Sequence, residues 1–439
     1  MDKENLKRRI FSVDLLRGIV MMIMLLDHTR EFVHAGALQS DPADPATTTV
    51  PVFFTRWITH FCAPVFVFIS GLSIYLQKMN GKPNGKLSRF LWTRGLWLIL
   101  LEFTVVRFGI VFNLDYSFFG MAQVIWVIGI SMIIMAAMIY LPVKFVGFVG
   151  VSMIVLHNLL DGFQIPPNIA FAGQPPPDLG QSLWIFLHQV GVVPIFGGSS
   201  QVFFAYPLIP WIGVMMAGYA LGTIYHLEPE RRRKILLYLG MTATVLFVGL
   251  RFANVYGDPV QWSTRSAFLD QAGARASSVE GSAAEQSPDP ESRRTPPVPT
   301  GTFTLLSFLN TNKYPPSLLF LLMTLGPGLI VLALTDRIDG SAIWQQICIT
   351  YGRVPMFYYI LQWFTAHGLG VLLGYLAGVD ISYLFAALFE MGQKAPPGHG
   401  FSLGVTYLAW IGGLIILYPL CLWWGNLKQR NKHWALSYL

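Results

Sequence analysis

The sequence predicts an all-α fold, a polytopic transmembrane helical bundle of about ten helices with both termini cytoplasmic. Hydrophobic residues make up 54% of the 439 residues and charged residues only 12%, a balance that soluble domains rarely tolerate. Apolar windows long enough to cross a bilayer, roughly 20 residues each, recur along the chain. Basic residues concentrate in alternate connections between these windows. We therefore expect a single membrane domain over residues 1–439.

The first window is Phe11–Phe32. It follows the charged start MDKENLKRR and contains Asp14 and Arg17, so we interpret it as a retained helix and not as a signal peptide. Nine further windows follow: Val52–Leu76, Phe90–Phe112, Gly120–Leu141, Phe145–Leu160, Phe203–Tyr225, Ile235–Ala253, Ser317–Thr335, Ile347–Leu373 and Phe401–Trp424. The segment Trp184–Phe196 is a candidate for a further interfacial or re-entrant piece.

The distribution of Lys and Arg predicts the sidedness. With the N-terminus inside, the inner connections hold most of the 30 basic residues, namely Lys3, Lys7, Arg8, Arg9, Lys78, Lys82, Lys86, Arg89, Arg94, Lys144, Arg231, Arg232, Arg233, Lys234, Arg337, Lys428, Arg430 and Lys432. The short outer connections hold Arg30 and Lys394 beside mostly acidic residues. The placement of the basic residues behind the net charge of +7 therefore indicates the orientation of the chain in a membrane. We expect the lipid bilayer as a partner and no nucleic acid.

One outer connection, residues 254–316, is much longer than the others. Its middle, AGARASSVEGSAAEQSPDPESRRTPPVPTG, is rich in Ala, Ser, Pro and charge. Such a composition cannot bury an apolar core, so we expect a largely disordered extracytoplasmic loop. The chain shows no internal repeat of the kind that marks many transporters.

Ionisable residues near the outer end of the first window are the strongest functional signal. A charge at mid-bilayer costs at least ~2.5–3.5 kcal/mol on insertion scales, and this end carries Asp27 and His28, with His34 six residues on. A lone histidine on an apolar helix usually belongs to the core, but two beside a carboxylate favour a catalytic site. Asp27 and His28 diverge by about 100° on a helix, so Asp27 is expected to serve His34 or a residue of another helix.

Further polar residues in the windows or close to their ends are candidates for binding a substrate or CoA. They are Arg17, Arg56, His60, Asn310, Lys313 and Arg353. Structural alternatives remain for two of them, because Arg17 also fits an ion pair with Asp14 three residues away and Arg56 also fits snorkelling towards headgroups. Arg56 and His60 are four residues apart and share a helical face. We assign His367 to core packing.

The chemistry of these residues leaves two functions open. The chain has no HExxH, Walker or GxGxxG motif, and its histidines, carboxylates and three cysteines lack metal-ligand spacing, so no metal is predicted. A general base beside a carboxylate and cations suits acyl transfer from an anionic thioester, and it suits proton-coupled transport equally well. A scaffold whose charges are merely structural is a third alternative.

Several segments resemble one family. RIFSVDLLRGIVMMIMLLDHTREF, FFTRWITHFCAPVFVFISGLSIYLQ, KLSRFLWTRGLWLILLE, NTNKYPPSLLF and YGRVPMFYYILQ are similar to the bacterial members of the heparan-alpha-glucosaminide N-acetyltransferase family. The most specific motif is S-V-D-x-x-R-G followed by D-H ten residues on. The likeness covers most of the membrane domain but not the long outer loop.

The resemblance implies an integral membrane acyltransferase that uses acetyl-CoA, with an essential histidine near the extracytoplasmic end of the first helix. Counted without gaps from Arg17, His28 falls where eukaryotic relatives carry a polar Asn, and His34 is the nearest counterpart of their catalytic histidine. Both histidines are therefore candidates. Gln362 stands where a histidine is expected from such relatives. Lysosomal location and heparan sulfate are not carried over.

The function that we expect is transfer of an acetyl group from acetyl-CoA to an amine or hydroxyl of a sugar or glycan. Acetyl-CoA is the acyl donor, and no permanently bound cofactor is expected. The alternative is a proton-coupled secondary transporter or lipid-linked sugar translocase. We expect a multi-pass protein of the bacterial cytoplasmic (inner) membrane, and the sequence leaves a homodimer open.

Overall fold

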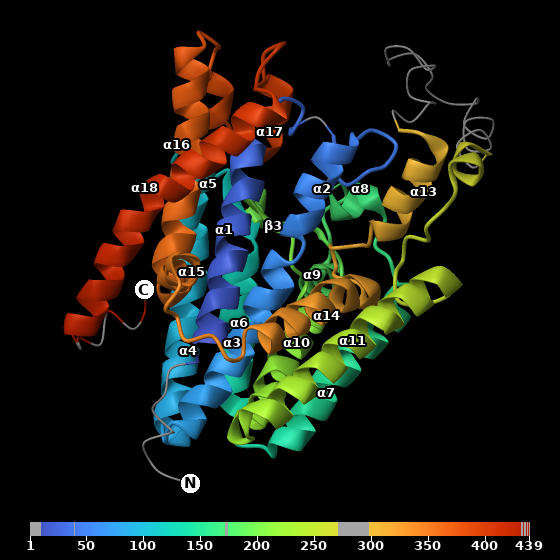
Figure 1. Cartoon of the computed structure of the whole chain (residues 1–439). Coiled ribbons are helices and arrows are strands. Elements are labelled where there is room, and N and C mark those ends of the chain that lie inside the picture. Colours follow the sequence, from blue (N-terminus) through green and yellow to red (C-terminus); the bar gives the residue numbers. More distant parts are fainter. Residues whose placement is uncertain are drawn as a thin grey trace.

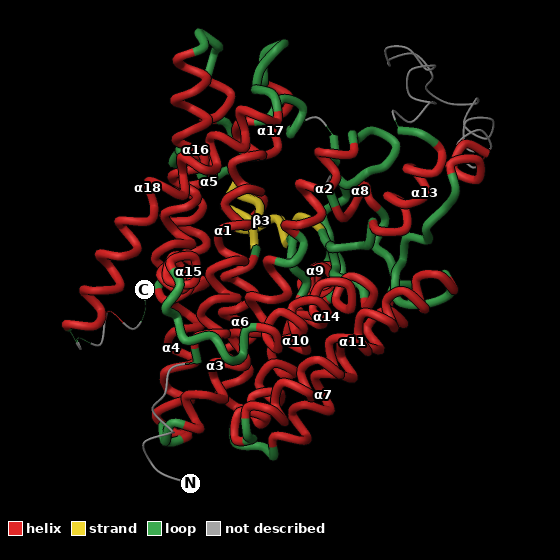
Figure 2. Tube along the Cα trace, viewed as in Figure 1, coloured by secondary structure: helices red, strands yellow, loops and turns green. Residues whose placement is uncertain are grey.

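The computed structural model describes residues 10–38, 40–171, 174–270 and 298–431, together with residues 433, 436 and 438. The described chain is mostly helical (Figures 1 and 2). Its α-helices are α1 (Phe11–Val33), α2 (Val50–Thr59), α3 (Cys62–Met79), α4 (Asn84–Leu101), α5 (Arg107–Val111), α6 (Val124–Met138), α7 (Val143–Leu156), α8 (Pro167–Ala170), α9 (Leu179–Leu187), α10 (Leu208–Leu221), α11 (Pro229–Ala253), α13 (Thr300–Leu309), α14 (Leu318–Leu334), α15 (Ile343–Arg353), α16 (Pro355–Leu376), α17 (Leu388–Lys394) and α18 (Leu403–Arg430).

Shorter helical turns extend or join these helices. A π-helical turn, η2 (Glu102–Val106), links α4 to α5. The 3-10 turns are η3 (His157–Leu160), η4 (Phe196–Gly198), η5 (Gly222–His226) and η6 (Ser382–Phe385). Each of the ten apolar windows predicted from the sequence overlaps at least one of the α-helices.

Two predicted windows are each divided into two helices. The window Val52–Leu76 forms α2 and α3, which are separated at His60 and Phe61. Pro64 explains this position, because a proline removes one hydrogen bond of the helix and its ring clashes with the carbonyl four residues earlier, here that of His60. The window Ile347–Leu373 is divided between α15 and α16 just before Pro355.

The lengths and compositions of the helices support a membrane-spanning protein. In the described part of the chain, five helical segments are long and apolar enough to cross a bilayer, namely Val50–Met79, Val143–Leu160, Leu208–His226, Pro229–Ala253 and Leu403–Arg430. Outer helices expose large apolar side chains, such as Phe148 on α7, Val245 on α11 and Ile415 on α18. In water such a surface would drive association, whereas in a bilayer it faces lipid.

Helix α1 lies at the centre of the bundle. It contacts α2, α3, α14, α15, α16 and α18, and Figure 1 shows it enclosed by them. Leu15 and Leu25, ten residues apart on α1, are both fully buried. A first helix with neighbours on every side can present its polar residues only to an internal space.

A small sheet is an exception to the predicted all-α fold. Strand β1 (Phe118–Ala122) pairs in parallel with β3 (Ser200–Phe204), which pairs antiparallel with β2 (Gly191–Ile195). The sequence window Gly120–Leu141 placed the last three residues of β1 inside a helix, and this placement is wrong. The sheet lies beside the upper half of α1 in Figure 2.

Both ends of the long connection 254–316 are packed. Arg251, buried at the end of α11, donates hydrogen bonds to the carbonyls of Val260, Ser307, Phe308 and Asn310. Helix α13 buries Phe303 and Leu306 against Phe53 of α2. Residues 271–297, on which most of the predicted disorder falls, lie outside the described residues, so disorder there stays a prediction.

Candidate functional site

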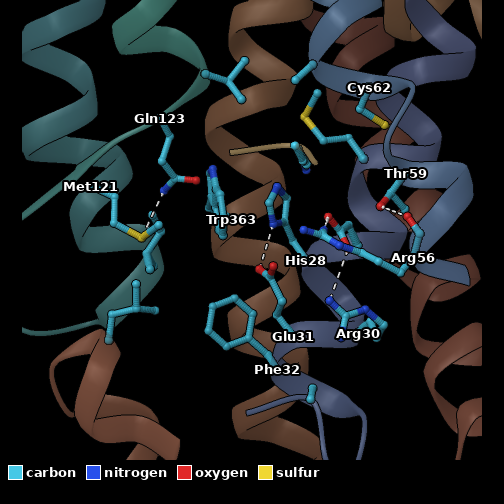
Figure 3. Close-up of a pocket in the computed structure, with 18 of the residues that line it drawn as sticks. His28, Arg30, Glu31, Phe32, Arg56, Thr59, Cys62, Met121, Gln123 and Trp363 are labelled. Atoms are coloured by element: carbon cyan, nitrogen blue, oxygen red, sulfur yellow. Dashed lines mark hydrogen bonds and ion pairs between the residues drawn. The ribbon is translucent and has the colours of Figure 1, made fainter. Parts of the chain in front are cut away.

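A cavity of about 330 Å³ surrounds the C-terminal half of α1. It is lined by Met24, Asp27, His28, Arg30, Glu31, Phe32, Ala37, Leu38, Pro42, Arg56, Thr59, Cys62, Ala63, Ile110, Met121, Gln123, Val124, Tyr206, Lys313, Tyr314, Tyr359, Trp363, Leu388 and Met391. These residues come from α1 and the loop after it, α2, α3, α5, β1 and the start of α6, the segment before α10, the loop before α14, α16 and α17. Figure 3 shows the side chains of several segments converging on this space.

His28 lies on the wall of this cavity, where two neighbouring side chains contact its ring. Its imidazole ring packs against the indole of Trp363 on α16, with 3.6 Å between ring centroids. Its Nδ1 lies 3.1 Å from Oε2 of Glu31, one helical turn further along α1 (Figure 3). An ionised Glu31 holds the hydrogen on Nδ1 and leaves the lone pair on Nε2. A neutral imidazole in this tautomer can accept a proton from a substrate.

Asp27 pairs with two arginines. Its Oδ1 accepts a hydrogen bond of 3.3 Å from Arg30 Nη2, and its Oδ2 accepts one from Arg56 Nη1 of α2. We expected Asp27 to interact with His34 or with a residue of another helix, and the structure shows the second, Arg56 of α2. The carboxylate therefore fixes two guanidinium groups beside His28.

His34 lies at the end of α1 and is not among the residues that line the cavity. Its backbone bridges to Phe401, and its N–H donates to the carbonyl of Arg30. Partial burial, together with the nearby charge of Arg30, lowers the pKa of His34 below its ordinary value. The described contacts of His34 thus close the end of the helix, whereas those of His28 face the cavity.

Arg17 and Arg353 lie at the opposite end of α1. Arg17 forms an ion pair of 3.2 Å with Asp14 and donates to Ser73 Oγ and to the carbonyl of Gly352. Arg353 is the last residue of α15. Eleven residues separate Arg17 from His28, which corresponds to about 16 Å along an α-helix, so neither arginine belongs to the cavity.

Two other predicted residues lie near the cavity without lining it. His60 is buried at the break between α2 and α3, with its ring 5.4 Å from that of Phe320. Asn310 ends α13, and its carbonyl accepts the hydrogen bond from Arg251. Gln362 is fully buried and its Nε2 lies 3.1 Å from the sulfur of Met24.

The structure adds residues that the sequence analysis did not select. Glu31 was detectable, since it follows His28 by three residues and so shares its helical face. Trp363, Tyr206 and Tyr314 carry no local signal, because only the packing of distant segments brings them to one cavity. Among the described residues no group of three or more His, Cys, Asp or Glu side chains is placed to hold a metal ion.

Comparison with known proteins gives one result beyond this geometry. The family model described as heparan-alpha-glucosaminide N-acetyltransferase, catalytic, matches residues 9–256, which is more than half of the chain. None of the curated proteins matches the chain. The matched residues include α1, α2 and the sheet, and therefore Asp27, His28 and Arg56, whereas Lys313 and Trp363 lie beyond the match.

Proposed function

The chain belongs to the heparan-alpha-glucosaminide N-acetyltransferase family and is thus an acetyltransferase-type membrane enzyme, and from this premise we propose that it transfers an acetyl group from acetyl-CoA to an amine or hydroxyl of a sugar or glycan. The reaction takes place in the cavity around the C-terminal half of α1, with His28 as the general base.

One observation carries this proposal. The ring of His28 is held between Trp363 and Glu31 on the wall of a cavity. Acyl transfer to an amine or hydroxyl needs a base that is fixed in position and neutral before reaction. The hydrogen bond to Glu31 supplies the orientation, and the ionised carboxylate stabilises the imidazolium once the proton has been taken up.

The proposed step conserves atoms and charge. The acceptor nitrogen or oxygen attacks the thioester carbonyl carbon, its proton passes to Nε2 of His28, and the carbonyl oxygen becomes an oxyanion. Arg56, on the cavity wall, is placed to stabilise this charge. The C–S bond then breaks, the acetyl group remains on the acceptor, and the CoA thiolate takes a proton from His28 or water.

The donor's phosphates need a second binding region. A thioester at His28 places the phosphates a whole pantetheine arm away, so groups beside His28 do not reach them. Arg17 and Arg353, at the other end of α1, remain the proposed partners of the phosphates. This assignment requires acetyl-CoA to extend along the bundle.

We also propose about ten membrane crossings with both termini cytoplasmic, in the cytoplasmic membrane of a bacterium. The proposal rests on the positive-inside distribution of Lys and Arg and on the resemblance to bacterial proteins. With this orientation, the cavity at the C-terminal end of α1 lies toward the extracytoplasmic side.

The test uses the purified full chain in detergent with acetyl-CoA labelled in the acetyl group and a panel of amino sugars and neutral sugars. We expect label to appear on at least one acceptor, and turnover to depend on His28. In parallel, the same sugars are offered to proteoliposomes. Uptake without acetylation would contradict the proposal and favour the transporter or translocase.

A further inference from the structure

The charges that line the cavity do not balance. Three cations, Arg30, Arg56 and Lys313, face two carboxylates, Asp27 and Glu31. Asp27 is shared by the two arginines, and Glu31 is bound to His28. With His28 neutral, the cavity therefore carries one unmatched positive charge. The proposed acetyl transfer to a neutral sugar would not change this sum, because its proton only moves from the acceptor to His28.

Of these three cations, Lys313 is the one that has no carboxylate partner among the described residues. No acidic side chain lies within 4 Å of its Nζ there, and its contacts are with Tyr314, whose ring centroid is 5.1 Å away. Burial alone would raise the pKa of Tyr314, but Lys313 and Arg56 together lower it, which shows how strongly positive this wall is. The ring of Tyr206 packs edge-on against that of Tyr314 at 5.6 Å.

The loop that carries Lys313 is firmly held. Asp258 accepts hydrogen bonds from the N–H of Asn312 and from Ser317 Oγ. His157 Nε2 lies 2.9 Å from the carbonyl oxygen of Pro316. These bonds anchor the loop on both sides of Lys313, which lines the cavity.

Lys313 is half-buried, and an unmatched charge that is partly removed from water is costly unless a bound group neutralises it. We propose that the acceptor carries one acidic group, a carboxylate or a phosphate, which binds Lys313 while its amine or hydroxyl lies at His28. The acceptor class is therefore an acidic sugar, a sugar acid or a sugar phosphate. The Tyr314 hydroxyl is a further hydrogen-bond donor for the acidic group of the acceptor. This inference rests on the proposed acetyl transfer.

The geometry favours the acceptor over acetyl-CoA as the source of the acidic group. Lys313 lines the same cavity as His28, and Arg56 there is bound to Asp27, the neighbour of His28 in the chain, so an acidic group on Lys313 shares this small cavity with the reacting atoms. The phosphates of CoA lie at the far end of its pantetheine arm and cannot reach this wall while the thioester is at His28. A volume of about 330 Å³ is also at the lower end for ligand pockets, which suits a sugar ring and an acetyl group.

The experiment compares matched acceptors and donors with the full-length protein in detergent. The acceptors are glucosamine, glucosamine 6-phosphate and the corresponding 2-amino uronic acid. The donors are acetyl-CoA and S-acetyl-N-acetylcysteamine, which has no phosphate. For the wild type we expect kcat/KM to be about tenfold to a hundredfold higher for an acidic acceptor than for glucosamine, the range of one charged hydrogen bond. This preference should be the same with either donor.

Lys313→Met removes the charge while keeping an unbranched side chain, and it should abolish the preference for acidic acceptors with both donors. Lys313→Arg should restore part of the preference. Lys394→Met is the matched control, because Lys394 is an exposed cation of α17 paired with Glu390, and it should leave the preference unchanged.

Three outcomes would overturn the inference while leaving acetyl transfer intact. They are equal use of neutral and acidic acceptors by the wild type, an equal loss for all acceptors in Lys313→Met, and a loss confined to acetyl-CoA, which would assign the cation to the donor's phosphates. Absence of transfer from both donors to every acceptor would instead refute the proposed function.

Discussion

At the scale of single residues, the two candidate histidines differ in what surrounds their rings. His28 has a carboxylate on Nδ1 and an indole against its face, and it lines the cavity. His34 follows by six residues, but it caps the helix and its backbone is tied to Phe401. A general base must reach the acceptor, so the geometry favours His28 as the base.

We expect His28→Ala to lower single-turnover acetyl transfer by ~10²-fold or more, the usual effect of losing a general base. Affinity for acetyl-CoA should change little, because the imidazole acts on the acceptor's proton. Glu31→Gln should give an intermediate loss, since it keeps a hydrogen bond but not the charge that stabilises the imidazolium. His34→Ala is the control and should retain turnover within a few-fold. The reverse ranking of the two histidines would reassign the base to His34.

We expect His34 to make the stability of the folded protein depend on pH. Its pKa is lowered in the folded protein by burial and by Arg30, so below about pH 6.5 the unfolded chain binds a proton that the folded protein resists. Stability should therefore fall as the pH drops below this value and should be unaffected above it. Thermal unfolding in detergent between pH 5 and pH 8 measures this effect. If His34→Gln unfolds with the same pH profile as the wild type, His34 is not the responsible group.

The sequence singled out several residues that line the cavity, but not the residues that they contact. Asp27, His28 and Arg56 are conspicuous because charged and titratable groups are rare in apolar helices, whereas Lys313 was selected at the entrance to a predicted helix. Their partners were less accessible, since Trp363 lies on α16, more than 300 residues from His28. Contacts of this kind depend on tertiary packing, which no local pattern encodes.

At the scale of elements, close helix packing fixes the position of α1. Gly18 of α1 lies against the backbone of α15, and a Cβ at this position would be 1.8 Å from the carbonyl oxygen of Cys348. Gly352 of α15 makes the reciprocal approach, where a Cβ would be 1.9 Å from the carbonyl oxygen of Asp14. Small residues at helix interfaces allow such approaches in membrane proteins.

Gly18→Ala should therefore destabilise the protein by about 1–3 kcal/mol or more, the usual cost of overpacking, and should lower its thermal unfolding temperature in detergent. Gly412→Ala is the matched control, because Gly412 is also helical but a Cβ there would meet no atom within 4 Å. It should unfold at the wild-type temperature or slightly above. Equal unfolding temperatures for the two variants would mean that α1 and α15 can separate at little cost.

The elements also show where hydrophobic patterning is informative. Long apolar windows identified the helices, because a bilayer requires length and apolar composition. The sheet was not predicted, since its strands have only five residues each and β1 pairs with a strand about eighty residues away. Pro64 indicates an irregularity of the helix near His60, although a proline alone does not distinguish a kink from two separate helices.

At the scale of the whole molecule, the fold encloses a polar cavity between helices whose outer surfaces are apolar. The cavity lies at one end of α1, and the ion pair of Arg17 with Asp14 lies at the other. Helix α1 begins and α18 ends toward the lower side of Figure 1, an arrangement compatible with both termini on one side of the bilayer.

The topology can be tested by cysteine labelling in intact cells. The native cysteines, Cys62, Cys348 and Cys421, are buried and are first replaced. An impermeant thiol reagent should then label Ser266→Cys in the long outer connection but not Asn431→Cys after α18, because the positive-inside rule places the Lys- and Arg-rich connections in the cytoplasm. Permeabilised cells serve as the control and should show labelling at both positions. Labelling of Asn431→Cys from outside would require an odd number of crossings or the opposite orientation, and the opposite orientation would place the cavity of His28 toward the cytoplasm.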